Sequence, residues 1–323
     1  MKKRLAMLVL AGAMVTSSLT GCGLKDSATV ATVAGDEIPA GLANFYARMT
    51  QAQYESMYSS YLGDNMWTTE ASEGKTYEKL VKDEVLKDLE NMYLLEDHMD
   101  DYKISLSDDE KKAIKDAAKE FSKDNDKDDK EKVSGDTEYV ERYLTLATIK
   151  QKMTDAIEAE ADTNVTDDEA KQKAMQYVLF SVNTTDANGV YQSLSDEEKA
   201  NVKANAEAFA EGAKETSDFE GFAQTQGYTV SEASFDGEGS ASVPEALAKA
   251  ADALDEGGVT DCIETDNGYY VAKVTSLFDQ EATEEKKQTI ISQRKQDKYD
   301  EVIKGWKERR HQCEEECVEE SRF

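Results

Sequence analysis

The sequence predicts a helix-rich α+β protein, and three observations support this fold class. Apolar residues recur at three- and four-residue spacing over long segments in both the first half and the last part of the chain. Between these segments lie two runs rich in β-branched and aromatic residues, 175–182 and 268–274, which predict strands. The 323 residues include only 2 Pro and 18 Gly, a composition that argues against a turn-rich sandwich or barrel.

Composition excludes several classes of function. The chain has 68 Asp and Glu against 38 Lys and Arg, so its formal net charge is −30. Such a surplus repels phosphate backbones and argues against a nucleic-acid partner. With only 2 His and 4 Cys there is little material for His-based catalysis or for a metal centre. We therefore expect no cofactor and no metal.

The N-terminus predicts export and lipid attachment. A basic start, Met1–Arg4, precedes a short apolar run, Leu5–Val15, and the quartet Leu-Thr-Gly-Cys ends at Cys22. This order indicates a signal peptide over residues 1–21, because the run is too short for a transmembrane helix. The quartet resembles the bacterial lipobox, which implies a lipid on Cys22 and a location on the outer face of the cytoplasmic membrane. The alternative is an ordinary secretory peptide with an incidental Cys.

Residues 22–29 are predicted to form a polar tether, and residues 30–161 an N-terminal helical domain behind a small hairpin. The hairpin spans residues 30–38, where Gly35 and Asp36 form the turn. Helices are expected at about 40–62, 77–102, from 107 onward and 136–161. The highly charged stretch 123–132 is predicted to be a solvated loop or a frayed helix end.

Residues 163–280 are predicted to form a compact α+β domain, whose strand-like runs distinguish it from the helical pattern of residues 30–161. A capping box at 166–169 precedes the first strand, and Pro244 opens a later helix. Between the strands, helices are expected at 195–216, 219–226 and 244–254, with an irregular or strand segment at 228–235.

The last segment, 281–323, is predicted to be a helix with an acidic tail. Its apolar positions include Tyr299, Val302, Ile303 and Trp306, which share one side of a helix. A lone helix with such a stripe must pack against another element. We expect it to complete the N-terminal helical domain, so that the middle domain is an insertion.

Three places in the chain resemble the PrsA-type foldase lipoproteins of Gram-positive bacteria, relatives of the chaperone SurA. The hairpin 30–38 runs into Phe45-Tyr46 as in that family's first helix. Val165–Glu169 resembles the entry into the parvulin domain, a peptidyl-prolyl isomerase (rotamase) fold. Residues 250–261, followed by Gly268-Tyr269-Tyr270-Val271-Ala272-Lys273, resemble the parvulin C-terminal pattern. The resemblance covers nearly the whole chain beyond Cys22.

The chain departs from the parvulin pattern at its functional positions. The resemblance places Tyr177 and Tyr270 where active parvulins carry a His pair. It also aligns the proline pocket, usually one Met and two Phe, with Val243, Leu247 and Asp252. A carboxylate at 252 is expected either to stand uncompensated in the pocket wall or to turn outward and leave the pocket shallow.

The altered positions leave open whether the protein is an enzyme. Rotation of an X-Pro bond needs an apolar grip on the ring and a polar network beneath it. Two tyrosine hydroxyls can hydrogen-bond to each other, but they do not exchange tautomers as a His pair does. We favour a parvulin fold retained for packing over residual isomerase activity.

An aromatic and Met-containing stripe in the 40–62 helix gives candidates for client binding. Leu42, Phe45 and Met49 are expected to pack in the core. For the later positions, core packing and contact with clients are equally compatible with the spacing. These candidates are Tyr54, Met57, Tyr58 and Tyr61.

The remaining cysteines give no clear functional signal. Cys262 is expected to be a plain core or strand residue. Cys313 and Cys317 lie near His311, and a metal site is one interpretation, since the His and the two Cys could share one helical face. A frayed acidic tail is the favoured interpretation of this segment.

Three functions remain in competition. The first is a membrane-anchored foldase or chaperone whose partners are unfolded exported proteins. The second is an active parvulin-type isomerase of the same architecture. The third is a solute-binding lipoprotein, but that class needs repeated βα units, which the helical stretch 30–161 does not provide. The sequence does not decide between a monomer and a homodimer, and it does not identify the clients.

Overall fold

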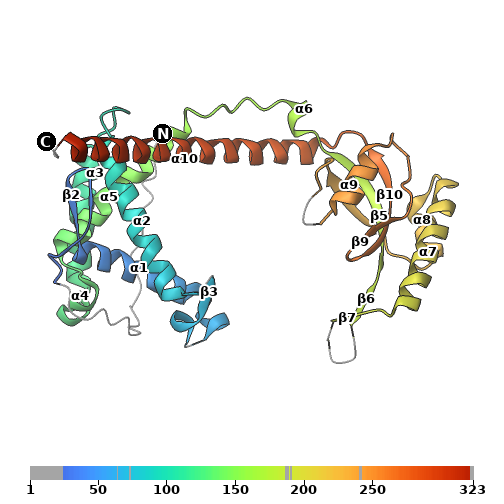
Figure 1. Ribbon diagram of the computed structural model, residues 1–323, viewed down its shortest axis with the longest axis horizontal. Coiled ribbons are helices and arrows are strands. Elements are labelled where there is room, and N and C mark those ends of the chain that lie inside the picture. Colours follow the sequence, from blue (N-terminus) through green and yellow to red (C-terminus); the bar gives the residue numbers. More distant parts are fainter. Residues whose placement is uncertain are drawn as a thin grey trace. The chain divides into compact units, whose positions relative to one another are not determined.

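The computed structural model describes residues 25–320, apart from 64, 73, 186–188, 190, 240 and 241. The predicted signal peptide 1–21 and Cys22 lie outside the described residues. The chain divides into two compact units (Figure 1). The first combines Met1–Ala161 with Lys295–Phe323, and the second is Asp162–Arg294. Both units combine helices with small sheets, so the predicted helix-rich α+β class is confirmed.

The first unit begins with a hairpin and continues as helices. The hairpin turn consists of Ala34 and Gly35, both with positive φ, so it lies one residue earlier than the predicted Gly35–Asp36 turn. A second, smaller hairpin and a 3-10 turn, which the sequence did not predict, lie between the first two long helices. The elements are β1 (Thr29–Val33), β2 (Asp36–Pro39), α1 (Ala40–Leu62), η1 (Met66–Thr68), β3 (Glu70–Ser72), β4 (Lys75–Thr76), α2 (Tyr77–Asp97), α3 (Asp108–Asp124), α4 (Lys127–Val133) and α5 (Thr137–Glu158).

The charged stretch 123–132, predicted to be a loop or a frayed end, instead contains the separate helix α4. Asp126 caps this helix by accepting a hydrogen bond from the Asp129 N–H. Its far end closes with Ser134 in the left-handed conformation. Val133 is buried against Phe45 and Phe121, so one apolar residue is enough to attach an otherwise charged helix to the unit.

The core of the first unit includes the end of the long C-terminal helix α10 (Gln280–Glu320). Ile303 and Trp306 are buried among residues of α2 and α5, and Tyr299 and Val302 pack at the edge of the same core. Trp306 stacks on His98 with ring centroids 4.0 Å apart. Helix α10 therefore supplies a face that covers the apolar stripes of α2 and α5.

A half-buried carboxylate joins several helices of this unit. Asp88 of α2 accepts hydrogen bonds from the Tyr46 hydroxyl (2.6 Å) and from Lys150 Nζ (2.5 Å). Burial, with a smaller contribution from the Asp88 charge, raises the pKa of Tyr299 to about 12. Arg142 of α5 makes a bidentate pair with Glu96, with both distances 2.6 Å. Because each pair joins residues far apart in sequence, these contacts hold the helices against one another.

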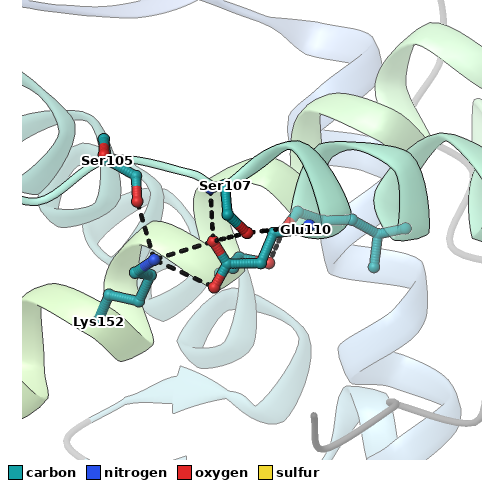
Figure 2. Close-up of polar contacts among 6 residues, drawn as sticks. Ser105, Ser107, Glu110 and Lys152 are labelled. Atoms are coloured by element: carbon teal, nitrogen blue, oxygen red, sulfur yellow. Dashed lines mark hydrogen bonds and ion pairs between the residues drawn. The ribbon is translucent and has the colours of Figure 1, made fainter.

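The N-terminus of α3 is tied to α5 by one cluster of polar contacts (Figure 2). Ser107 and Glu110 form a capping box, in which the hydroxyl accepts from the Glu110 N–H and the carboxylate accepts from the Ser107 N–H. Lys152 of α5 donates to both Glu110 oxygens, at 2.9 and 3.0 Å, and to the Ser105 carbonyl at 2.8 Å. The Lys152 hydrogen bond, followed by the Ser107 contacts, holds the pKa of Glu110 below its ordinary value.

We expect Glu110→Gln to lower the free energy of unfolding of the first unit by about 1 kcal/mol at neutral pH. Gln still fits the capping box, so the loss isolates the charge of the pair. A carboxyl with a lowered folded-state pKa stabilises the protein above its unfolded pKa, and this contribution disappears as the pH falls through the folded-state pKa.

Urea unfolding followed by tryptophan fluorescence measures this effect, because Trp67 and Trp306 both belong to the first unit. The difference between wild type and variant should shrink once the pH falls below about 4.3, the ordinary glutamate value. Glu120→Gln, at an exposed position of the same helix, is the matched control. A difference that persists unchanged into acid would contradict this account of Glu110.

The second unit is built on a four-stranded antiparallel sheet of order β8-β5-β10-β9. Helices α7 and α8 pack on one face, and α9 packs on the other. The sequence predicted β5 and β10 but missed β9 and the β6–β7 hairpin. The elements are α6 (Asp167–Ala170), β5 (Lys173–Ser181), β6 (Asn183–Thr185), β7 (Tyr191–Ser193), α7 (Asp196–Lys214), α8 (Phe219–Thr225), β8 (Ser231–Phe235), α9 (Glu245–Asp252), β9 (Ile263–Thr265) and β10 (Gly268–Ser276).

The second unit extends to Arg294, beyond the boundary at 280 that the sequence suggested. The first turns of α10 belong to it because they bind its other residues. The buried Thr283 hydroxyl accepts from the Gln172 N–H at 3.0 Å, and Lys286 pairs with Asp236 at 3.0 Å. Lys287 pairs with Asp167 at 2.5 Å.

The strand pairing and the helices bear on two further points: the solute-binding alternative and the presence of membrane-spanning helices. The named sheets pair their strands antiparallel, so the described residues do not supply the repeated βα units of a solute-binding lipoprotein. Among the described residues, no helix combines the length and apolar character needed to cross a bilayer.

Candidate functional site

Tyr177 and Tyr270 lie together on one face of the second unit's sheet. In the register of β5 and β10, Tyr270 is opposite Leu179 and Tyr177 is opposite Ala272. The two tyrosines are therefore diagonal neighbours, and their ring centroids are 5.8 Å apart. Tyr270 is buried, with 5% of its surface exposed, whereas Tyr177 is half-buried. The face that carries them is the one covered by α9.

The surroundings of the pair keep the Tyr270 hydroxyl protonated at neutral pH. Burial, followed by the neighbouring Tyr177, raises the pKa of Tyr270, and a hydrogen bond with the Asn267 side chain acts in the opposite direction. A neutral phenol donates one hydrogen bond and accepts others. The raised pKa of Tyr270 therefore favours its neutral phenol form.

The two apolar proline-pocket candidates, Val243 and Leu247, are core residues in this structure. Both are fully buried, in the cluster that α9 forms with Met175, Phe235 and Ala272. Their side chains fill the space between helix and sheet, so they do not present an open apolar wall to a proline ring.

Asp252, the third pocket candidate, turns outward at the end of α9. Its side chain is 47% exposed and pairs with Lys173 Nζ at 2.9 Å. The same Nζ donates to the Asp252 carbonyl at 2.7 Å. Of the two expected outcomes for this carboxylate, the outward orientation is the one observed, and the charge is compensated by Lys173.

A comparison with protein families finds one match for this part of the chain. Residues 141–288 match the family model described as a PPIC-type PPIASE domain, a peptidyl-prolyl isomerase domain. Residues 141–288 are therefore similar to PPIC-type PPIase domains. The match confirms the parvulin part of the resemblance, and it includes the strands that carry Tyr177 and Tyr270.

Several solved structures are similar to this chain. PrsA from Bacillus cereus shares 15% identity, with 88% of this chain and 93% of that chain covered and a TM-score of 0.30. The foldase PrsA from Streptococcus pneumoniae shares 19% identity over 83% and 87%, with a TM-score of 0.28. A SurA-like chaperone of Campylobacter jejuni shares 14% identity over 71% and 86%, with a TM-score of 0.26. No curated protein matches the chain in a sequence comparison.

Outside the PPIC-type domain, the client-binding candidates lie near the end of α1. Met57 is 60% exposed and Tyr58 42% exposed, whereas Tyr54 is half-buried. Tyr54 packs against Tyr58 and against Trp67 of η1, with ring centroids 5.6 and 6.2 Å apart. We call Tyr54, Met57, Tyr58 and Trp67 the aromatic surface. The side chain of the fourth candidate, Tyr61, lies outside the described residues.

Sequence reasoning missed Trp67 as a member of this surface. It lies in a short segment between helices that has no periodic pattern. An indole in such a segment is itself a usable signal, since Trp is rarely placed where it makes no packing contact.

Two carboxylates lie at the edge of the aromatic surface. Trp67 Nε1 donates to Glu55 at 2.9 Å, and the Tyr54 hydroxyl donates to Glu84 of α2 at 3.5 Å. Burial, with the Glu84 charge as the next cause, raises the pKa of Tyr54. The surface thus combines exposed apolar groups, aromatic rings and negative charge.

The cysteine and histidine candidates supply no site in the part of the chain that is described. Burial raises the pKa of Cys262, a half-buried residue packed against the α7–α8 side of the sheet. The side chains of Cys313, Cys317 and His311 lie outside the described residues. Within the described part, no group of His, Cys, Asp and Glu is placed to hold a metal ion.

Proposed function

We propose that this protein is a foldase and chaperone for exported proteins, held on the outer face of the membrane by a lipid on Cys22, with weak or absent isomerase activity. The PPIC-type domain and the PrsA-type resemblance support the foldase class. The basic, apolar and lipobox segments of the N-terminus support export and anchoring. The aromatic surface supplies exposed apolar side chains for contact with unfolded chains.

The tyrosine pair is the main observation behind the proposal that isomerase activity is weak or absent. Tyr270 is neutral and buried, and its neighbour Tyr177 is a second phenol rather than a proton-exchanging imidazole. The apolar side chains that would grip a proline ring, Val243 and Leu247, are closed within the core. The face therefore lacks a switching polar network, and Val243 and Leu247 give no grip on a proline ring.

An isomerisation assay on short X-Pro peptides, paired with aggregation suppression on an unfolded protein, tests this function. We expect suppression of aggregation together with an isomerisation rate near the uncatalysed background. Tyr177→Phe and Tyr270→Phe should leave both readouts unchanged. A turnover comparable to that of active parvulins, lost in either Phe variant, would show that tyrosines replace the His pair.

The active isomerase remains the second candidate, and one observation favours it. Leu179 is 41% exposed and lies opposite Tyr270 in the sheet, so an accessible apolar side chain does adjoin the tyrosine pair. If Leu179 contacts a substrate proline, Leu179→Ser should abolish a measurable isomerisation rate without changing the thermal unfolding midpoint.

Lipid attachment has its own test. We expect Cys22→Ala to release soluble protein or to leave an unprocessed precursor, because the thiol is the only group at that position that can carry a thioether-linked lipid. Fractionation of cells into membrane and soluble material measures the result. Full membrane retention of the variant with the signal peptide removed would rule out Cys22 as the anchor.

A further inference from the structure

The aromatic surface is an uncovered apolar feature of the first unit. Met57 and Tyr58 are two of the four large hydrophobic side chains found exposed among the described residues. The other two, Leu179 and Phe278, lie in the second unit. A Met beside a Tyr provides a deformable apolar contact that tolerates partners of different shape.

The rim of this surface is negative. Glu84 is exposed and accepts from the Tyr54 hydroxyl, and Glu55 accepts from Trp67. Lysines of the same segment are paired with other acids: Lys75 and Lys79 with Asp83, at 2.9 and 3.6 Å, and Lys82 with Glu78 at 2.5 Å. Burial lowers the pKa of Arg48, and this cation lies close enough to Glu55 and Glu78 for their charges to act, more weakly, in the opposite direction. Among the ion pairs of the described residues, none includes Glu84.

The aromatic rings and the carboxylates of this surface both attract cations. The faces of Tyr and Trp rings attract a Lys or Arg cation, and a carboxylate at the ring edge adds a charge-assisted hydrogen bond. An anionic segment would meet repulsion at the same position. The chemistry of the surface therefore favours a ligand that is both apolar and cationic.

We propose that the aromatic surface and Glu84 select unfolded client segments in which Lys or Arg residues alternate with apolar ones. The proposal rests on the chaperone function proposed above and adds the chemical class of client. Apolar side chains of the client contact Met57 and Tyr58, while its cations approach the Tyr54 and Tyr58 rings and the Glu84 carboxylate.

Three unstructured peptides with the same apolar residues and four Lys, four Gln or four Glu test this selectivity against the full chain. Fluorescence anisotropy of the labelled peptides gives the Kd values. The Lys peptide should bind about five- to tenfold more tightly than the Gln peptide, and the Glu peptide more weakly than both. Tyr58→Ser should weaken the binding of all three.

Charge-neutral variants locate the selectivity. Glu84→Gln should weaken the Lys peptide about threefold and leave the Gln peptide unchanged. Glu120→Gln makes the same charge change at an exposed position of α3 and should leave both peptides unchanged. An unchanged far-UV circular dichroism spectrum and unfolding midpoint establish that each variant is folded.

Equal Kd values for the Lys and Gln peptides would overturn the proposal. Equal effects of Glu84→Gln and Glu120→Gln would overturn it as well, because the preference would then come from the overall charge of −30. Aggregation suppression of an uncharged unfolded protein reports the chaperone function separately. If the wild-type protein does not suppress this aggregation, the proposed function is contradicted. The ranking of the peptide Kd values alone decides the selectivity.

Discussion

Trp306→Ala should lower the free energy of unfolding of the first unit by about 3–5 kcal/mol, the usual cost of removing a buried aromatic side chain. Only 6% of Trp306 is exposed, and its ring stacks on His98 and makes an edge contact with Tyr102 at 6.1 Å between centroids. The substitution removes both contacts and leaves a cavity between α10 and α2. A loss of this size is a large part of the stability of an ordinary domain.

Urea unfolding followed by the fluorescence of the remaining Trp67 and by far-UV circular dichroism measures this loss. Lys304→Ala, two residues away on α10, is the matched control, because that side chain is 77% exposed. The control should leave the unfolding midpoint within experimental error. If Trp306→Ala behaves like Lys304→Ala, α10 does not stabilise the first unit and the packing described for it is wrong.

The long amphipathic elements were predictable because their apolar residues recur at a fixed period. In α10, Tyr299, Val302, Ile303 and Trp306 share one face, and the structure places them at the core of the first unit. In the sheet, the β-branched and aromatic residues of the run 175–182 were enough to identify β5, in which Tyr177 and Leu179 lie on one face. Periodicity of this kind depends only on residues close in sequence.

The elements and contacts that were missed depend on residues far apart in sequence. Strand β9 has three residues and forms only against β10, so it shows no pattern of its own. The ion pair of Asp252 involves Lys173, 79 positions away, and decides that the carboxylate turns outward. Val243 and Leu247 are equally suited by type to a pocket wall or to a core, and only the packing of α9 on the sheet distinguishes the two.

Gly268→Ala should destabilise the second unit by about 3–5 kcal/mol, combining overpacking with an unfavourable backbone conformation. Gly268 begins β10 with φ of +139°, a region that side-chain-bearing residues rarely adopt. An added Cβ would lie 2.2 Å from the Phe180 carbonyl oxygen, an atom of the neighbouring strand that cannot move aside as a flexible side chain can. Relief of this clash would displace the start of β10, which carries Tyr270.

Gly257→Ala is the matched control for this substitution, because it also has positive φ (+84°) but has open space where the Cβ would lie. It should cost only about 1 kcal/mol, the backbone contribution alone. Far-UV circular dichroism reports the unfolding of both units, while tryptophan fluorescence follows only the first unit, which contains both tryptophans. Gly268→Ala should therefore shift the circular dichroism transition far more than the fluorescence transition. Equal costs for the two glycine variants would mean that the close approach of Gly268 to Phe180 does not constrain the sheet, and hence does not fix the tyrosine pair.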